Sequence, residues 1–166
     1  MISLSVIVPA YNEITTIEQI LTRIREQKIQ SIDIEIVVVD DGSTDGTRQF
    51  LAENPNLYDI LLENPQNLGK GGAVKRALEA ASGEYILFQD ADLEYDPSEY
   101  GKLVFPVLNF QADVVMGSRF LAPNWTRIFY FWHKMGNGLI TNWFNLLYNT
   151  TWTDVYSCYL MFRSNL

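Results

Sequence analysis

Stretches rich in branched apolar residues alternate with amphipathic stretches over the first two thirds of the chain. Residues 3–8 and 34–39 are of the kind expected in strands of a parallel sheet that is covered on both faces. Between them, isoleucine and leucine recur at helical spacing, which predicts a helix over residues 14–28. Further strands are predicted at 58–62, 84–89 and 113–116, and further helices ending near residue 53 and at about 72–81, 97–109 and 134–149. This alternation predicts an α/β fold with a mostly parallel central sheet.

Polar turns follow four of the predicted strands. They are Tyr11-Asn12-Glu13, Asp40-Asp41, Asp90-Ala91-Asp92 and Gly117-Ser118-Arg119. Ligands of open α/β sheets bind beyond the carboxyl ends of the strands. The four turns are therefore expected to converge on one site.

Composition narrows the class of protein. Of 166 residues, 48% are hydrophobic and 19% charged, which supports a packed core and excludes a disordered chain. The single cysteine, Cys158, excludes a disulfide framework, and the single histidine, His133, excludes a metal site built from several histidines. A net charge of -8 argues against a nucleic-acid partner.

Charge and aromatic residues are unevenly distributed. Residues 1–100 carry 18 acids and 7 bases, whereas residues 101–166 carry 2 acids, 5 bases and 15 of the 22 aromatic residues. We therefore expect one domain with two parts, a ligand-binding α/β core over 1–119 and an aromatic, basic segment over 120–166. The apolar face predicted for helix 134–149 suits either the core or a membrane surface, and both interpretations stay open.

The chain shows no secretion or membrane-crossing signal of its own. It has no run of 18 apolar residues and no basic stretch before its first strand. We expect a cytoplasmic catalytic unit. If its partner is a membrane surface, we expect it to be a peripheral protein at the cytoplasmic face of that membrane. The sequence stops after Phe162-Arg163-Ser164-Asn165-Leu166 without a closing helix, which suggests part of a longer protein. The oligomeric state is open.

The acidic turn Asp90-Ala91-Asp92 carries the sharpest chemical signal. Two carboxylates one residue apart can hold Mg²⁺ or Mn²⁺, which prefer oxygen ligands and often complete their coordination with substrate phosphates. Asp40 is a candidate to accept hydrogen bonds from a nucleobase or ribose, with Asp41 in either a ligand or a turn role. The Gly69-Lys70-Gly71-Gly72 stretch lacks Walker A spacing, so it serves either a diphosphate or loop packing.

Beyond residue 116, the basic and acidic residues that could serve the site give a less specific indication of their role. Arg119 follows a predicted strand, where it suits either a phosphate or a surface ion pair. His133 and Asp154 are by default structural residues.

Together these segments resemble the family 2 glycosyltransferases of the GT-A fold, a three-layer Rossmann-like architecture. The matching segments, in the family's order, are residues 6–13, 37–47, 67–73, 90–92 and 117–119. Within the family, Asn67-Leu68-Gly69-Lys70-Gly71 and Gly117-Ser118-Arg119 look most like the dolichyl- or polyprenyl-phosphate sugar transferases.

The resemblance implies a role for each matching residue. The nucleotide-sugar, a GDP- or UDP-sugar, would lie against Pro9, Tyr11, Glu13, Val38, Asp40, Lys70, Asp90 and Ala91. Asp90 and Asp92 would hold the metal, with Glu94 adding a ligand. Arg119 would face the acceptor phosphate or the donor diphosphate, and His133 stands where relatives carry a basic residue.

The expected activity is inverting sugar transfer to a polyprenyl phosphate, which is already anionic and needs no general base. Transfer to a sugar hydroxyl is the alternative, with Asp154 as the candidate base by position. A nucleotide-sugar-binding module without turnover is the alternative of another class. A nucleotidyltransferase is disfavoured because Pro9-Ala10-Tyr11-Asn12-Glu13 stands where that class needs a basic, glycine-rich loop.

Overall fold

The computed structural model describes residues 1–117, 131–155, 157 and 159–166, with His133 described by its backbone alone. Two compact units make up the chain. The first comprises Met1–Val115 and Leu160–Leu166, and the second comprises the described part of Met116–Tyr159. The predicted division at residue 119 stays a prediction.

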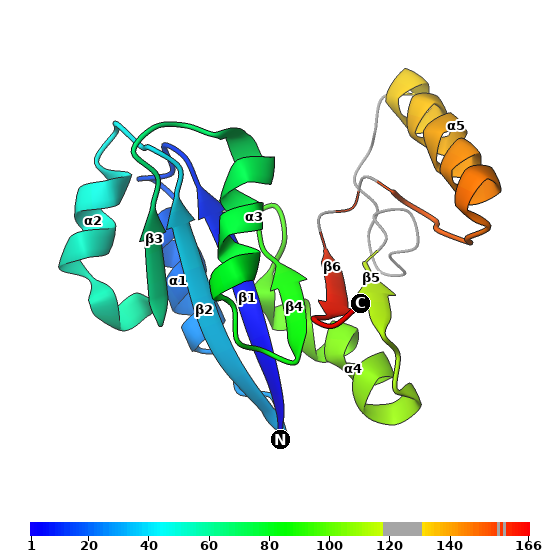
Figure 1. Cartoon of the computed structure of the whole chain (residues 1–166), viewed down its shortest axis with the longest axis horizontal. Helices are drawn as coiled ribbons and strands as arrows, with labels where there is room; N and C mark the ends of the chain where they lie inside the picture. The colour runs from blue at the N-terminus through cyan, green and yellow to red at the C-terminus, as the bar shows by residue number, and fades with distance from the viewer. Residues whose placement is uncertain (118–130, 156, 158) are drawn as a thin grey trace. The chain divides into compact units, whose positions relative to one another are not determined.

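A six-stranded sheet of order β3-β2-β1-β4-β6-β5 organises the fold (Figure 1). Its strands are β1 (Ile2–Ala10), β2 (Ile32–Asp40), β3 (Ile60–Glu63), β4 (Tyr85–Phe88), β5 (Val114–Met116) and β6 (Leu160–Arg163). The helices are α1 (Ile17–Arg25), α2 (Thr47–Glu53), η1 (Pro55–Leu57), α3 (Gly69–Ala80), η2 (Pro97–Glu99), α4 (Tyr100–Phe110) and α5 (Phe131–Tyr148). The predicted α/β class and mostly parallel sheet are confirmed.

Parallel pairing brings the ends of three strands to one level. β1 pairs in parallel with both β2 and β4, and β2 pairs in parallel with β3. Ala10 lies opposite Asp40, and Asp40 lies opposite Glu63. The loops that follow these strands therefore start side by side at one edge of the sheet.

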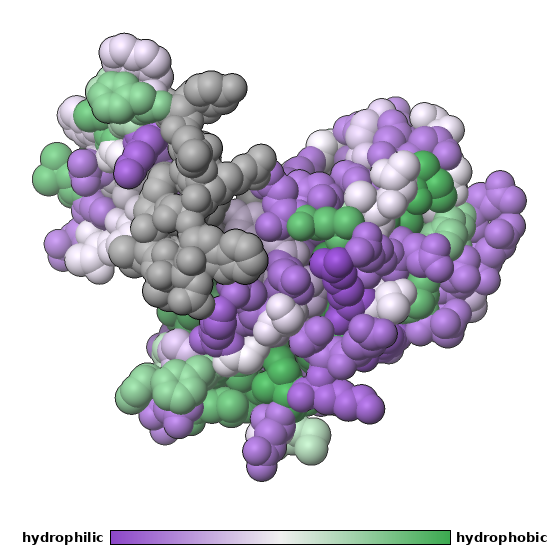
Figure 2. All heavy atoms as spheres, turned by 180° about the vertical axis from the view of Figure 1, so that it is seen from behind, coloured by the Kyte–Doolittle hydropathy of each residue, from purple (hydrophilic) through white to green (hydrophobic). Residues whose placement is uncertain are grey.

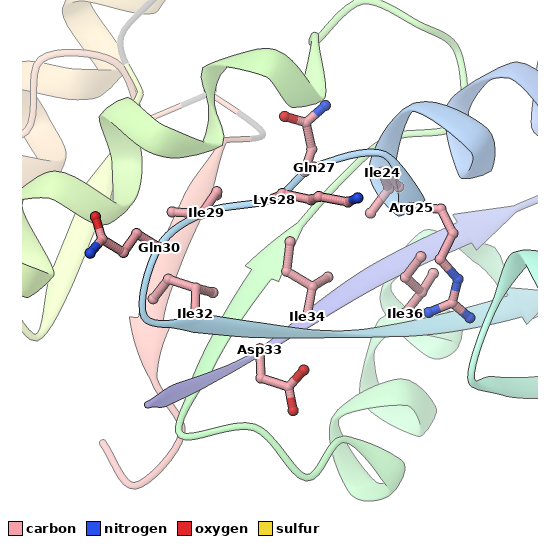
Figure 3. A pocket seen from close by; sticks show the side chains of 10 residues that line it. All are labelled: Ile24, Arg25, Gln27, Lys28, Ile29, Gln30, Ile32, Asp33, Ile34 and Ile36. Atoms are coloured by element: carbon pink, nitrogen blue, oxygen red, sulfur yellow. The ribbon is translucent and has the colours of Figure 1, made fainter.

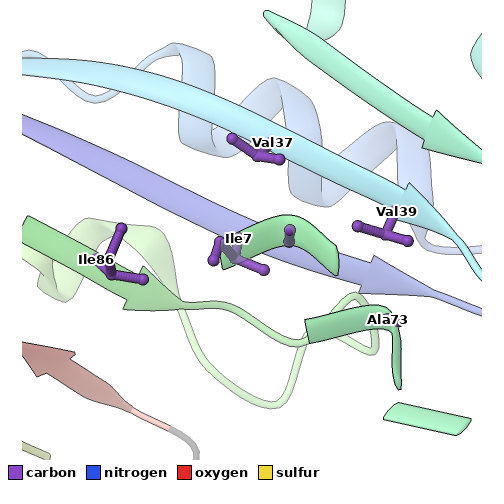
Figure 4. Close-up of a cluster of buried hydrophobic side chains, with 6 residues drawn as sticks. Ile7, Val37, Val39, Ala73 and Ile86 are labelled. Carbon is purple, nitrogen blue, oxygen red and sulfur yellow. The ribbon is translucent and has the colours of Figure 1, made fainter. Parts of the chain in front are cut away.

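Helices cover both faces of the sheet, α3 in front and α1 behind in Figure 1. On the α3 face, a buried cluster joins three strands to the helix (Figure 4); it comprises Ile7, Val37, Val39, Ala73, Ala77 and Ile86. On the other face α1 buries Ile17, Ile20, Leu21 and Ile24. The apolar periodicity of residues 14–28 thus marked a real helix, although the helix itself is shorter.

Helix boundaries and one strand differ from the sequence expectation; α5, for example, begins at Phe131, three residues before its predicted start. Helix α3 begins at Gly69, three residues before the predicted start at Gly72. Strand β6 was not predicted; it pairs antiparallel with β4, with Met161 opposite Leu87 and Arg163 opposite Tyr85. The guanidinium of Arg163 lies over the Tyr85 ring, 5.3 Å from its centroid, which further ties β6 to β4.

Helix α4 leaves apolar side chains on the surface of the first unit. Phe105 and Phe110 are 54% and 73% exposed, and their rings meet edge to face at 5.9 Å. Hydrophobic side chains gather over α4 at the lower left of Figure 2. In the described part of the chain, α5 included, no helix combines the length and hydropathy that a bilayer crossing requires. The predicted cytoplasmic location stays a prediction.

A polar cluster fixes the turn before β4 against β1 and β2. The Ser5 hydroxyl, fully buried, donates to the Glu35 carboxylate and accepts from the Gly83 amide at 2.8 Å. The Ser82 amide and hydroxyl also donate to Glu35, at 2.9 and 2.7 Å. Burial raises the pKa of Glu35, but the hydrogen bonds from Ser5 and Ser82 outweigh burial and lower it overall from 4.5.

We expect Glu35→Ala to lower the free energy of unfolding at neutral pH by about 1–2 kcal/mol, because hydrogen bonds to a partly exposed charged group are lost. The folded-state pKa is the lower one, so this contribution is complete above pH 4.5 and disappears as the pH falls through the folded value. Urea unfolding on both sides of this range measures the change. Glu79→Ala, an exposed change on α3, is the control; a Glu35→Ala loss that stays equal in acid would contradict the assignment.

Candidate functional site

The loop after β1 is fastened to the loop after β2 by reciprocal hydrogen bonds. The Asn12 amide donates to the Ser43 hydroxyl at 3.0 Å, and the Thr44 amide donates to the Asn12 side-chain carbonyl at 2.8 Å. The Glu13 amide donates to the Thr47 hydroxyl at 2.9 Å. The two polar turns predicted to converge therefore form one connected rim.

A glycine lets the loop before α3 reach this rim. Gly42 has a φ of +78°, and a Cβ atom there would lie 2.6 Å from the Gln66 carbonyl carbon and 2.7 Å from the Asn67 nitrogen. Both the backbone conformation and the close approach of residues 66–67 exclude a side chain at this position. The glycine of the Asp-Asp-Gly turn is thus required by packing.

Asp41 fixes the same loop, the one before α3, by hydrogen bonds. Its Oδ1 accepts from the Asn64 side-chain amide at 2.6 Å and from the Leu68 amide at 3.0 Å. Asp41 is 3% exposed and Asn64 is 1% exposed. A buried carboxylate therefore sets the position of the loop that leads into α3.

Asp40 is engaged by an arginine. It is fully buried, and its Oδ2 accepts from Nε of Arg48, on α2, at 2.7 Å. Arg48 also forms an ion pair with Glu63 at 3.4 Å, so it links the ends of β2 and β3. Asp40, predicted to accept from the nucleotide, accepts from Arg48 in this structure.

A cavity of about 250 Å³ opens where these loops meet. It is lined by Pro9, Tyr11, Asp41, Asn67, Gly69, Lys70, Ala73 and Asp90. Four predicted site residues, Pro9, Tyr11, Lys70 and Asp90, thus lie around one space. They come from the ends of β1 and β4 and from the first turn of α3.

Lysine and aspartate meet inside this cavity. The Lys70 ammonium donates to Oδ1 of Asp90, joining the start of α3 to the loop after β4. Asp92 is exposed, and its Oδ1 accepts from the Glu94 amide at 2.9 Å in a local turn. Across the described residues, no group of three or more His, Cys, Asp or Glu side chains gathers as a metal site would require. Glu94 does not form such a group with Asp90 and Asp92.

The donor set at this loop nevertheless fits a divalent cation of the Mg²⁺ or Mn²⁺ type. Asp90 lines the cavity and offers carboxylate oxygen, the ligand that hard cations prefer, and Asp92 follows two residues later. Asp90 already faces a positive group, because the Lys70 ammonium lies against it. One or two carboxylates suffice when substrate phosphates and water complete the coordination.

Other residues expected at the nucleotide lie in the surrounding framework. Val38 is fully buried within β2, and Ala91 is 3% exposed. The Glu13 carboxylate accepts from the Thr16 hydroxyl at 2.8 Å, which stabilises the start of α1. None of these three side chains is among those that line the described cavity.

The acceptor-side candidates belong to the second unit. Arg119 lies outside the described residues, as does the side chain of His133, whose backbone is part of α5. Asp154 is fully buried and accepts from the Asn137 side-chain amide at 2.9 Å. Asp154 therefore joins the segment after α5 to the helix.

Asp45, in the loop after β2, and Asp96, before η2, have lowered pKa values. Burial raises the pKa of Asp45, but hydrogen bonds from Thr47 and the Ile14 amide together outweigh it and lower the pKa from 3.8. At Asp96 the Ser98 amide is the main cause of a pKa below 3.8, aided by Arg23. Both carboxylates therefore stay ionised at neutral pH and fix local turns.

A larger cavity, about 480 Å³, lies at the opposite end of β2 (Figure 3). Ile24, Ile34 and Ile36 line it, together with the exposed side chains of Arg25 and Lys28. It lies at the amino-terminal end of the strand, whereas the converging polar turns lie at the carboxyl end. The smaller cavity is therefore the candidate site.

The sequence did not assign three of the lining residues, Asn67, Gly69 and Ala73. Asn67 is exposed, and its side-chain carbonyl accepts from the Gly69 amide at 2.8 Å, which shapes the entry into α3. The sequence feature that points to them is the asparagine- and glycine-rich stretch itself. That stretch suits a diphosphate, but its pattern does not assign a role to each residue.

The family model for glycosyl transferase family 2 matches residues 5–166. A curated relative, the dolichol-phosphate mannosyltransferase of Pyrococcus furiosus, is 35% identical over 126 residues, which cover 73% of this chain and 35% of that protein. The chain spans less than half the length of the curated relatives it matches.

Solved structures share the fold. The mannosyltransferase PcManGT of Pyrobaculum calidifontis, solved with GDP-Man and Mn²⁺, is 35% identical with a TM-score of 0.56, over 67% of this chain and 34% of that chain. Glucosyl-3-phosphoglycerate synthase of Mycobacterium tuberculosis matches 99% of this chain and 57% of that chain with a TM-score of 0.71 at 24% identity, which shows the fold alone. The predicted GT-A fold is thus confirmed.

We expect Gly42→Ala to lower the free energy of unfolding by about 2 kcal/mol or more, because the added methyl group meets backbone atoms at a positive φ. Thermal or urea unfolding measures the loss. Gly101→Ala, at an exposed position of α4 with nothing within 4 Å of its Cβ, is the matched control and should be neutral or slightly stabilising. Equal stability of the two variants would contradict the packing role of Gly42.

Proposed function

The chain belongs to glycosyltransferase family 2, and from this we propose that it transfers a sugar from a nucleotide-diphosphate sugar to a polyprenyl phosphate with inversion at the anomeric carbon. The observation that carries the proposal is the cavity between β1, β4 and α3, where a half-exposed aromatic ring, a lysine and an aspartate face one space. The relative from P. furiosus is a dolichol-phosphate mannosyltransferase, which supports a lipid-phosphate acceptor.

The cavity residues suit the parts of such a donor. Tyr11, 46% exposed, offers its ring to a nucleobase, beside Pro9. Asp41 brings a carboxylate to the same space, where it can accept from a base or ribose. Lys70, in the first turn of α3, supplies positive charge to the diphosphate. PcManGT, solved with GDP-Man, supports a nucleotide-sugar donor.

Asp90 and Asp92 would hold Mg²⁺ or Mn²⁺ at the donor diphosphate. When bound, such an ion neutralises charge on the leaving diphosphate as a Lewis acid. The Mn²⁺ in the PcManGT structure supports a divalent metal requirement. Asp90, only 17% exposed in its side chain, supplies its oxygens from a fixed position at the end of β4.

Burial of Asp154 favours a phosphate over a hydroxyl acceptor. A hydroxyl group needs a general base, which must reach the proton it removes. Asp154 is fully buried and already accepts from Asn137. A lipid phosphate needs positive charge instead, and Arg119 and His133 are the residues we assign to it.

Helix α5 is the segment we assign to a membrane surface. Its side chains Trp132, Met135, Leu139, Trp143 and Leu146 recur at helical spacing and are 44–76% exposed. Another face packs on the following segment, where the Phe144 ring meets the Trp152 ring at 6.3 Å. Aromatic residues on an exposed apolar face are typical of helices in the membrane interface.

We expect Asp90→Asn and Asp92→Ala each to reduce sugar transfer by at least about 100-fold, because a metal-held leaving group loses its charge neutralisation. The assay incubates the chain with Mn²⁺, radiolabelled UDP- or GDP-sugars and a polyprenyl phosphate, and counts product extracted into organic solvent. Asp33→Asn, an exposed change at the start of β2, is the control and should keep full activity. Near-normal transfer by Asp92→Ala would contradict the metal assignment, and water-soluble product would contradict the lipid acceptor.

We expect Leu146→Glu to reduce binding to anionic phospholipid vesicles by about tenfold, because a carboxylate replaces a side chain that would enter the interface. Co-sedimentation with the vesicles measures the bound fraction. Asn142→Glu adds the same charge to an exposed polar position of α5 and should have a smaller effect. If both variants bind as the unchanged chain does, α5 does not contact the membrane.

A further inference from the structure

One ion pair in the cavity joins two groups to which the proposed chemistry gives different partners. Lys70 is assigned to the diphosphate and Asp90 to the metal, yet the Lys70 ammonium donates directly to the Asp90 carboxylate. The lysine side chain is 53% exposed, whereas the aspartate side chain is 17% exposed. The carboxylate is therefore held in place, and the lysine is the partner with room to move.

Asp90 lies in an acidic segment of the chain, and its carboxylate therefore needs a positively charged partner. Six acidic residues lie between Glu84 and Glu99. Among the described ion pairs of this segment, Glu84 pairs with Arg163, Asp96 with Arg23 and Glu99 with Lys102. Those three acids have 48–55% exposed side chains, so water also solvates them. Asp90, 17% exposed, is less exposed than these three acids of the same segment, and a counter-charge therefore matters more there.

We propose that Lys70 is an exchangeable cation: it neutralises Asp90 in the empty cavity and moves to the donor diphosphate when a divalent metal takes its place. This rests on the proposed function, because it requires a donor that carries a diphosphate. An ammonium group and a divalent cation repel each other and compete for the same carboxylate oxygens. The flexible four-carbon stem of lysine allows the ammonium to change partners.

The exchange couples the two ligands. Metal alone must displace Lys70 from Asp90, whereas metal that arrives with a nucleotide diphosphate gives the displaced ammonium a new anionic partner. Each ligand therefore raises the affinity for the other, as linkage requires. The cavity binds the two together in preference to either one alone.

The test measures Mn²⁺ binding without any nucleotide, by the electron paramagnetic resonance signal of free Mn²⁺. Lys70→Met keeps the apolar stem and removes the charge, so we expect Mn²⁺ to bind about fivefold more tightly than in the unchanged chain. Lys75→Met removes the same charge from an exposed position of α3 and measures the general electrostatic effect, which should stay within about twofold. Lys70→Arg keeps the charge and should not tighten Mn²⁺ binding.

Nucleotide binding should respond in the opposite direction. At saturating Mn²⁺, UDP or GDP should bind about tenfold more weakly to Lys70→Met, because the diphosphate loses a cation. Adding Asp90→Asn to Lys70→Met should remove the gain in Mn²⁺ affinity, which assigns that gain to this carboxylate. Unchanged or weaker Mn²⁺ binding by Lys70→Met, or a gain matched by Lys75→Met, would overturn the inference.

These outcomes are separable from failure of the proposed function. A chain in which Lys70→Met tightens Mn²⁺ and weakens UDP or GDP, but which transfers no sugar, upholds the exchange and contradicts the transferase. A chain that transfers sugar while Lys70→Met leaves Mn²⁺ affinity unchanged upholds the transferase and overturns the exchange.

Discussion

Parallel pairing of β1 with both β2 and β4 sets the position of every polar loop around the candidate site. The central strands are buried on both faces, so polar side chains that serve a ligand occur only where a strand ends. The register places Ala10, Asp40 and Glu63 side by side, and the loops that follow leave from one level. A register shift of one residue would turn Asp40 toward the opposite face and break its pairing with Arg48. The site therefore depends on the register before it depends on any individual side chain.

Placing so many carboxylates at one edge has an electrostatic cost, which basic residues from the helices offset. Arg48 reaches Asp40 from α2, and Lys70 reaches Asp90 from α3. Amide groups also stabilise a carboxylate at this edge, because the Leu68 backbone amide and the Asn64 side-chain amide donate to Asp41. Helices following the parallel strands thus complete the core and also supply the charges that make an acidic site edge stable.

Hydrophobic patterning predicted most of the fold because β1, β2, β4 and α1 bury continuous apolar runs or faces. The strand that it missed is β6, a four-residue strand whose partner, β4, lies more than 70 residues earlier in the chain. This strand forms because of that distant pairing. Its sequence neighbours are aromatic, like the segment before it, so the local sequence does not distinguish it as a strand. Helix α3 began earlier than predicted because glycines at its start signal a loop, whereas Gly71 and Gly72 adopt the helix.

Within the site, the sequence identified four residues that line one cavity, but not how neighbouring aspartates divide their positions. Pro9, Tyr11, Lys70 and Asp90 line one cavity as expected. Between Asp40 and Asp41 the sequence favoured the former for the ligand, yet Asp41 lines the cavity and Asp40 faces Arg48. Adjacent residues at a strand end point to opposite sides, and loop 64–68, which follows β3, contacts Asp41 on the side where the cavity lies. That long-range contact leaves no local trace in the sequence.

Two of the basic residues at this edge, Arg48 and Lys70, show how side-chain chemistry separates a fixed ion pair from an exchangeable one. Arg48 binds Asp40 and also donates to the backbone carbonyl of Asn64. A planar guanidinium with several fixed donors suits a buried carboxylate such as Asp40. Lys70 has one rotatable ammonium on a flexible stem and lies in the open cavity, 53% exposed. An arginine at 70 would bind Asp90 through a rigid fork and resist exchange, whereas a lysine can leave it. Asp40, after β2, therefore serves as framework, whereas Asp90, after β4, is the carboxylate that changes its cation in the proposed exchange.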